Sequence, residues 1–172
     1  MRNFLLGMVS TLAVIVIAVC CYIRFGFAEV RGDLPVLGFE TSLMHAGVHA
    51  SIRREVPEVP NPVAPTDENL IKGGKYYEAV CGGCHGTPGR PFGSHGIPLI
   101  PAPPEFPVVG TELTEAQIFW VAKHGIRRSG MFANGAFAKD ENLWATAAYI
   151  KHMGTLSQAV KDGIAKPASR QN

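Results

Sequence analysis

The chain begins with one continuous apolar run, and apolar residues recur at helical spacing further along. Residues 4–23 carry no charge, and a helix of that length, rising about 1.5 Å per residue, spans the roughly 30 Å core of a bilayer. A signal peptide cleaved at Gly26-Phe27-Ala28 is the alternative. The apolar region of a signal peptide is usually only about 7 to 15 residues long, and Arg24 separates the run from that site. The pattern therefore favours an uncleaved transmembrane anchor over residues 1–24.

Residues 25–65 are predicted to form a spacer that contains one helix. Thr41 or Ser42 is a suitable capping residue, and an imperfect apolar stripe continues from there to Glu55. Four prolines within residues 57–65 then favour an extended polyproline segment. We expect this segment to be a semi-rigid stalk that marks the domain boundary.

Two histidines of the spacer helix, His45 and His49, are four residues apart and share one face. This spacing suits a metal ion, but the sequence offers no third ligand nearby. A partly exposed helix face is therefore the better interpretation.

Residues 66–154 have the pattern of a small all-α domain. A first helix begins at the capping residue Thr66 and runs into Cys81. Gly73, Tyr77 and Cys81 are spaced four apart and lie on one face. Because a glycine inside a helix costs about 1 kcal/mol relative to alanine, Gly73 indicates that another helix packs closely there.

Two further helices are predicted in this domain. The capping box Thr114-Glu115-Ala116-Gln117 opens the second helix, and Gly125 ends it. The third helix begins near Asp140, continues with apolar residues at helical spacing, and stops at Gly154.

The remaining segments are expected to be less regular. Residues 86–110 are rich in proline and glycine, so regular helix is not expected across them. Residues 155–172 are predicted to be a C-terminal tail, with a short helix over 157–165 and a mobile end over 166–172.

Composition narrows the classes of function. Apolar residues make up 47% of the chain and charged residues 17%, below the usual quarter or so, as expected if part of the chain lies in lipid. Nothing in the sequence indicates nucleic-acid binding, a phosphate loop or a Ser-His-Asp arrangement. Six cationic residues form either a docking ring for an acidic partner or, more simply, a solvated face: Lys72, Lys75, Arg90, Lys123, Arg127 and Arg128.

The strongest chemical signal is Cys81-Gly82-Gly83-Cys84-His85. C-x-x-C-H is the attachment signature of a c-type haem, in which both thiols bond to the porphyrin and the imidazole ligates the iron. The two glycines let the backbone pass close to the ring. A redox dithiol needs a thioredoxin-like pattern, and a zinc site needs two more ligands. Neither context is present, so the sequence predicts one covalently attached haem c.

The other two cysteines, Cys20 and Cys21, lie within the apolar run. Lipidation is one interpretation, but Ile17-Ala18-Val19 lacks the small residue expected just before a lipoprotein cysteine. Small apolar filler in a membrane helix is therefore the better interpretation. No cysteine pair is left for a structural disulfide.

The second axial ligand decides what a haem at this site does, because methionine opposite histidine closes the iron and raises its potential. Met131 is the best candidate, since it lies in a glycine-flanked loop between two helices. His95 and His124 are rivals for a bis-histidine site. We expect a carbonyl within residues 100–104 to orient His85, and Arg127 or Arg128 to pair with a propionate.

The order of these parts resembles the class I cytochrome c family over residues 66–154. The resemblance implies a small all-helical fold whose first and last helices cross near Gly73, with Tyr77 and Tyr149 packed around the contact. It also implies that Met131 is the distal ligand, although Phe132 follows it where many bacterial members have proline. The predicted cofactor-binding residues are Cys81, Cys84, His85, Met131, Tyr77 and Arg127, with His85 and Met131 as metal ligands.

The predicted function is that of a membrane-tethered, mono-haem electron carrier of bacterial type. We expect it to pass single electrons between redox protein partners and to have no small-molecule substrate. Because c-type haem is attached outside the cytoplasm, the haem domain is expected on the periplasmic side of the inner membrane. One alternative is a fixed haem subunit of a larger respiratory or dehydrogenase complex that uses the helix over 41–55 as its contact surface. The other is an open-iron haem enzyme or gas sensor.

Overall fold

The structure is a computed structural model, and it describes residues 1–31, 34, 38–90, 99 and 102–166. The chain forms two compact units, residues 1–34 and 35–172. Over the described residues the secondary structure is helical, and the one β-type pairing is an isolated antiparallel bridge between Thr87 and Arg90. The predicted all-α fold class is confirmed.

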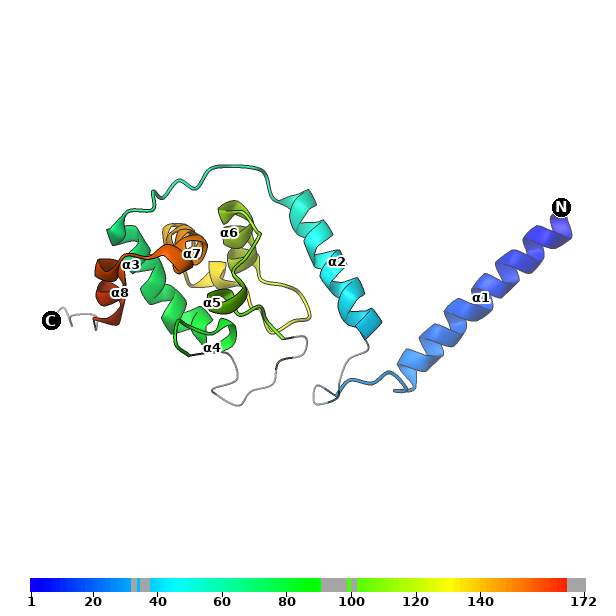
Figure 1. The fold of residues 1–172 in the computed structure, drawn as a ribbon. Helices are drawn as coiled ribbons and strands as arrows, with labels where there is room; N and C mark the ends of the chain where they lie inside the picture. The colour runs from blue at the N-terminus through cyan, green and yellow to red at the C-terminus, as the bar shows by residue number, and fades with distance from the viewer. Residues whose placement is uncertain (32–33, 35–37, 91–98, 100–101, 167–172) are drawn as a thin grey trace. The chain divides into compact units, whose positions relative to one another are not determined.

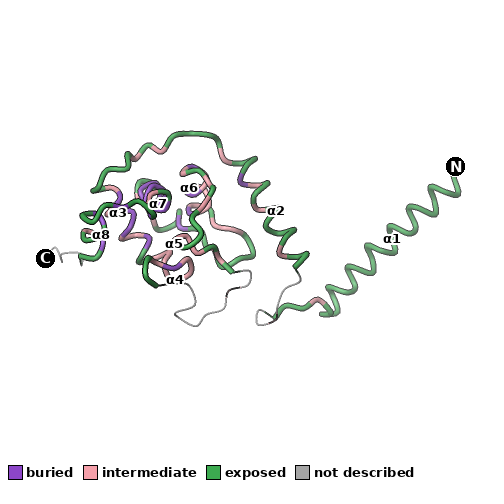
Figure 2. The backbone as a smooth tube through the Cα atoms, viewed as in Figure 1, coloured by how far each residue is buried: buried purple, intermediate pink, exposed green. Residues whose placement is uncertain are grey.

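The first unit consists mainly of helix α1 (Arg2–Arg24), whose residues are all exposed (Figure 2). Among the described residues it is the one helix long and apolar enough to cross a membrane. An arginine lies at each end of the helix, at Arg2 and Arg24, where the side chains can reach the headgroup region. The helix therefore fits the single-pass anchor expected over residues 1–24.

The second unit contains seven α-helices in the described part of the chain (Figure 1): α2 (Gly38–Glu55), α3 (Asp67–Tyr76), α4 (Gly82–His85), α5 (Phe106–Val109), α6 (Glu115–His124), α7 (Asp140–His152) and α8 (Gln158–Ala165). A π-helical turn, Tyr77–Cys81, joins α3 to α4. Two 3-10 turns, Asn134–Ala136 and Met153–Thr155, flank α7.

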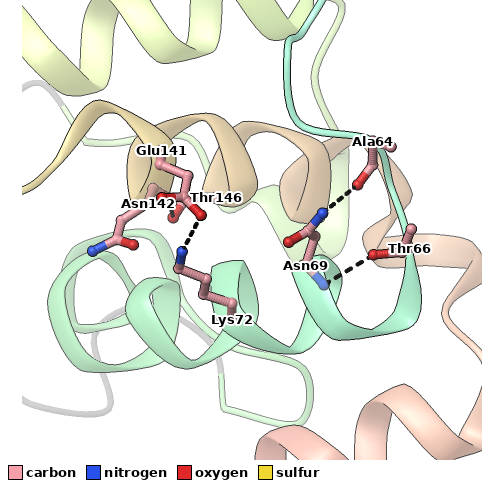
Figure 3. Close-up of polar contacts among 7 residues, drawn as sticks. All are labelled: Ala64, Thr66, Asn69, Lys72, Glu141, Asn142 and Thr146. Carbon is pink, nitrogen blue, oxygen red and sulfur yellow. Dashed lines mark hydrogen bonds and ion pairs between the residues drawn. The ribbon is translucent and has the colours of Figure 1, made fainter.

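The helix ends follow the predicted capping chemistry. The Thr66 side chain accepts a hydrogen bond from the Asn69 amide at 3.3 Å, at the start of α3 (Figure 3). Both hydrogen bonds of the capping box between Thr114 and Gln117 are present at the start of α6, and Gly125 ends that helix with φ at 67°. Short α5, in contrast, lies within the proline- and glycine-rich segment where no regular helix was expected.

The core forms where α3 crosses α7, as the interior glycine predicted. A Cβ atom at Gly73 would overlap the backbone carbonyl of Ala145, so only glycine permits the two backbones to approach this closely. Near the crossing, the rings of Tyr77 and Tyr149 pack with centroids 5.4 Å apart. The expected crossing and its aromatic contact are confirmed.

Helix α8 belongs to the same core, although its residues lie in the expected C-terminal tail. Val160 is fully buried. A Cβ atom at Gly163 would overlap the Ile71 side chain on α3, and one at Gly74 would overlap Ile164 on α8. The predicted helix over 157–165 is therefore present, and it packs on α3. The expected mobile end lies almost wholly outside the described residues.

The proline-rich segment is not helical, as expected, but its second half is attached to the helical domain. The Asn61 side-chain amide donates to Glu115 Oε2 on α6 at 2.6 Å and to the Trp144 carbonyl on α7 at 3.1 Å. These contacts hold the chain against the domain several residues before α3 begins. The freely swinging part of the expected stalk is correspondingly shorter.

The helix predicted in the spacer is α2, which begins three residues before Thr41 and ends at Glu55 as expected. It contacts α6, and Ile52 near its C-terminal end is buried, with 3% of its surface exposed. His45 and His49 are both exposed. In the described part of the chain no cluster of three or more potential metal-binding side chains forms.

Candidate haem-attachment site

The five residues of the C-x-x-C-H motif begin at Cys81, which is the last residue of the π-helical turn. Helix α4 (Gly82–His85) contains four of them, and Gly86, with φ at 71°, ends it. A Cβ atom at Gly82 would overlap the Thr87 side chain, whereas the space beside Gly83 is open. π-Turns occur preferentially at functional sites. The helical pattern alone predicted an uninterrupted α-helix here and did not indicate the wider turn.

The two cysteine thiols are partly buried and form no disulfide. Burial, and secondarily the neighbouring Cys84, raises the pKa of the Cys81 thiol to about 12. Redox-active dithiols and zinc-binding thiolates require a low pKa, so the environment of Cys81 disfavours both alternatives. Unpaired thiols three residues apart, followed directly by a histidine, fit covalent attachment of haem.

His85 is held in a defined tautomer and orientation. Its Nδ1 lies 2.9 Å from the Pro104 carbonyl oxygen. Because a carbonyl oxygen only accepts hydrogen bonds, Nδ1 donates the proton, and Nε2 keeps its lone pair for a metal. Burial lowers the pKa of His85, partly offset by this hydrogen bond, so the neutral imidazole is favoured. The predicted orienting carbonyl within residues 100–104 is confirmed as Pro104.

Phe106 also helps to fix the position of the His85 imidazole. Its ring stacks on that of His85, with centroids 4.7 Å apart and planes 12° from parallel, and it also contacts Tyr77. Helix α5, which begins at Phe106, places this ring two residues after the Pro104 carbonyl. Phe106 was not predictable as a site residue from the sequence, where its place between Pro104 and Pro107 was the one available signal.

Tyr77 connects the core to the motif. Its side chain is fully buried, and its hydroxyl donates to the Gly86 carbonyl at 2.7 Å, with the His85 carbonyl at 3.3 Å. Burial raises the pKa of Tyr77 above its ordinary value, so the hydroxyl stays protonated and remains a donor. The predicted site residue therefore holds the end of α4 in place.

We expect Tyr77→Phe to lower the free energy of unfolding by about 1 to 2 kcal/mol, because it leaves the buried Gly86 carbonyl without its donor. Denaturant unfolding of the haem-loaded protein measures the change. Tyr149→Phe is the matched control, since the structure gives the Tyr149 hydroxyl no hydrogen bond among the described residues. Equal losses of stability in both variants would contradict the assigned role of the Tyr77 hydroxyl.

The backbone around Met131 is fixed by local hydrogen bonds. The Ile126 amide donates to the Met131 carbonyl at 2.8 Å, and the Met131 amide donates to Ser129 Oγ at 3.0 Å. A Cβ atom at Gly125 would approach the Met131 carbonyl oxygen to 2.6 Å. Glycine at this position, with its positive φ, therefore lets the loop fold back against the end of α6.

Asn134 ties this loop to the helix that leads into the motif. Its side chain is 2% exposed; the amide donates to the Ala122 carbonyl at 2.9 Å, and the oxygen accepts from the Tyr76 hydroxyl at 3.1 Å. The loop after Met131 and the last residue of α3 are thus linked by one buried polar group. Sequence reasoning missed Asn134, because Asn-Gly is an ordinary turn signal and gives no sign of burial.

The other predicted site residues are less closely associated with the motif. Arg127 and Arg128 are exposed, Arg128 with φ at 62°, and among the described residues neither forms a hydrogen bond or ion pair with the motif. His124 is exposed and packs against the ring of Trp120, while His95 lies outside the described residues.

Two of the six predicted docking cations form ion pairs with α7. Lys72 Nζ lies 2.6 Å from Glu141 Oε1 (Figure 3), and Lys123 Nζ lies 2.7 Å from Asp140 Oδ2. Lys72 also lowers the pKa of the Glu141 carboxyl. These two lysines thus bind α3 and α6 to α7, which weakens the interpretation of all six cations as one docking ring.

Comparison with known families agrees with the geometry. Residues 68–150 match the family model described as cytochrome C oxidase, cbb3-type, subunit III. The matched range runs from the first turn of α3 to Ile150 on α7, and it includes the whole C-x-x-C-H motif and Met131. Comparisons with curated proteins and with solved structures found no match.

The matched family and the attachment motif together define the helical domain as a class I c-type cytochrome with covalently bound haem c. Within that class, the domain is similar to the cbb3-type subunit III cytochromes described by the matching model. Haem c supplies reversible one-electron oxidation and reduction of its iron. The presence of this domain is consistent with a role in electron transfer rather than with catalysis by the domain on its own.

Proposed function

We propose that this chain is a membrane-tethered, mono-haem electron carrier whose iron has histidine and methionine as axial ligands. In the proposal Cys81 and Cys84 hold the haem through thioether bonds, and His85 and Met131 ligate the iron. The observation that carries it is the 2.9 Å contact between His85 Nδ1 and the Pro104 carbonyl. This contact leaves Nε2 as the ligating nitrogen and fixes the plane of the ring before metal binds.

The residues around the motif support electron transfer by keeping the coordination geometry unchanged between oxidation states. The Tyr77 hydroxyl holds the backbone that follows His85. Asn134 holds the loop that carries Met131. A rigid surrounding of this kind would limit the reorganisation that each electron transfer requires.

The proposal also places the chain at a membrane. Helix α1 is the anchor, residues 25–65 are the spacer, residues 66–154 are the haem domain, and residues 155–172 are the C-terminal segment. Attachment of c-type haem outside the cytoplasm puts the haem domain on the periplasmic side of the bacterial inner membrane. The redox partners are then proteins reached on that side.

Redox titration of the purified chain tests the proposal. We expect one haem per chain, covalently retained after denaturation, a single one-electron transition, and a low-spin iron in both oxidation states that does not bind carbon monoxide rapidly. Rapid binding of carbon monoxide to the reduced protein would instead support the open-iron enzyme or sensor.

A second candidate is a fixed haem subunit of a larger respiratory complex, and two observations favour it. The matched family is described by the name of an oxidase subunit, and the Asn61 contacts shorten the swinging part of the spacer. Extraction from the native membrane with a mild detergent distinguishes the candidates. A carrier elutes alone, whereas a subunit elutes with its complex in a constant ratio.

A further inference from the structure

Helix α2 has a second apolar face that its contact with the helical domain leaves exposed. At about 100° per residue, Phe39, Leu43, Ala46 and Ala50 fall within a sector of about 60°. We call these four residues the α2 apolar stripe. Val48 and buried Ile52 lie on the opposite side of the helix, and Ile52 is the residue that α2 buries in its unit.

The two large side chains of the stripe lie at the end of α2 that follows the predicted anchor in the sequence. Phe39 is 76% exposed and Leu43 is 58% exposed. Ala46 and Ala50 are exposed as well. Leaving large apolar side chains in water costs free energy in proportion to their area, roughly 25 cal/mol per Å², so a continuous stripe of this kind indicates a partner that excludes water.

The sequence around the stripe has the charge distribution of a segment in contact with lipid. Between Asp33 and Arg53 the only Asp, Glu, Lys or Arg is Glu40. Arg53 and Arg54, both exposed in the last turn of α2, lie on either side of the stripe, about 50° from its centre. Arg54 is ion-paired with the neighbouring Glu55 at 2.6 Å, whereas no ion pair of Arg53 is seen among the described residues. Cations that flank an apolar face suit the phosphates of lipid headgroups.

Chain connectivity keeps α2 close to the membrane. α1 ends at Arg24 and α2 begins at Gly38, so the 13 connecting residues reach at most about 45 Å even when fully extended. The first residue of the stripe, Phe39, is the second residue of α2. If α1 is in the bilayer, the same membrane surface is therefore the nearest apolar environment available to the stripe.

We propose that α2 lies between the helical domain and the lipid surface, with the α2 apolar stripe in contact with the bilayer and Val48 and Ile52 directed to the domain. This inference rests on the proposed membrane anchor. It makes α2 a second, interfacial attachment that holds the haem domain near the membrane. The range of partners is then restricted to redox centres close to the membrane surface.

Spin labels on single cysteines test the proposal in the full-length, haem-loaded chain. Cys20→Ala and Cys21→Ala remove the thiols of the anchor, and Leu43→Cys places a label in the stripe. His45→Cys, about 160° around the helix and exposed, is the matched control. The protein is reconstituted alone in nanodiscs of phosphatidylethanolamine and phosphatidylglycerol, and label collisions with oxygen and with a water-soluble nickel chelate are measured.

We expect the Leu43 label to collide with oxygen several-fold more often, relative to the nickel chelate, than the His45 label. Equal ratios at the two positions would overturn the proposal. Protection of Leu43 in native membranes but not in nanodiscs would also overturn it, because the covering partner would then be a protein.

Carbonate washing of native membranes that contain the labelled chain tests the anchor separately from the lipid contact of α2. A chain that stays in the membrane with a water-exposed Leu43 label retains the anchor and refutes only the lipid contact of α2. A chain that washes off refutes the anchor, and with it the lipid contact.

Discussion

We expect Met131→Ala to lower the midpoint potential of the haem iron by a substantial part of the roughly 0.8 V range that axial ligands cover. The reason is that Met131 is the proposed axial ligand, and a thioether ligand would favour ferrous iron. The backbone of the loop is fixed independently by the Ile126 amide, Ser129 and Asn134. The substitution is therefore expected to change the ligand with little change in the fold.

Redox titration and carbon monoxide binding measure this change. The reduced variant is expected to bind carbon monoxide rapidly, whereas the unaltered protein does not. Met44→Ala, which removes an exposed methionine from α2, is the matched control and leaves both properties unchanged. If Met131→Ala also leaves the potential and the spectrum unchanged, Met131 is not the ligand, and His124→Ala and His95→Ala become the next variants.

Gly73→Ala destabilises the domain by about 3 kcal/mol, at the upper end of the range for overpacking a core. The new methyl group overlaps the Ala145 carbonyl, and because a backbone atom cannot rotate away, α3 and α7 must separate. That separation also disturbs the contact between Tyr77 and Tyr149. A drop in melting temperature on the order of 10 to 20 °C follows for a domain of this size.

Thermal unfolding followed by far-ultraviolet circular dichroism checks this expectation. Gly154→Ala is the control, because nothing lies within 4 Å of a Cβ atom at that position. Helix propensity alone would make Gly73→Ala stabilising by about 1 kcal/mol, so the sign of the effect is decisive. A melting temperature equal to or above that of the unaltered protein would show that the helices do not cross as closely as described.

The limits of sequence reasoning are clearest at Pro104 and Asn134. The need of a ligating histidine for an orienting carbonyl was predictable, and residues 100–104 contained it. The position of Asn134 was not predictable, because its burial depends on two partners, Ala122 and Tyr76, that belong to other helices. A hydrogen bond across 58 residues of chain leaves no periodic signal in the sequence.

In the spacer, too, one feature was predictable from the sequence and another was not. Four prolines predicted an extended segment, since proline lacks the donor and the freedom that a helix needs. Whether such a segment is free or attached is decided by contacts with other elements. Asn61 attaches it by bonding to α6 and α7, and that pairing depends on the folded arrangement of both helices.

The sequence by itself determined the apolar α1, the helix boundaries set by Thr66, Thr114 and Gly125, and the C-x-x-C-H motif, because each depends on residues close together in the chain. It also indicated the close crossing at Gly73 from the local cost of an interior glycine. Tertiary structure alone decided which carbonyl orients His85, that Asn134 joins the Met131 loop to α3, and that α2 keeps one apolar face exposed. These features arise from contacts between distant segments, which form only when the helices have packed.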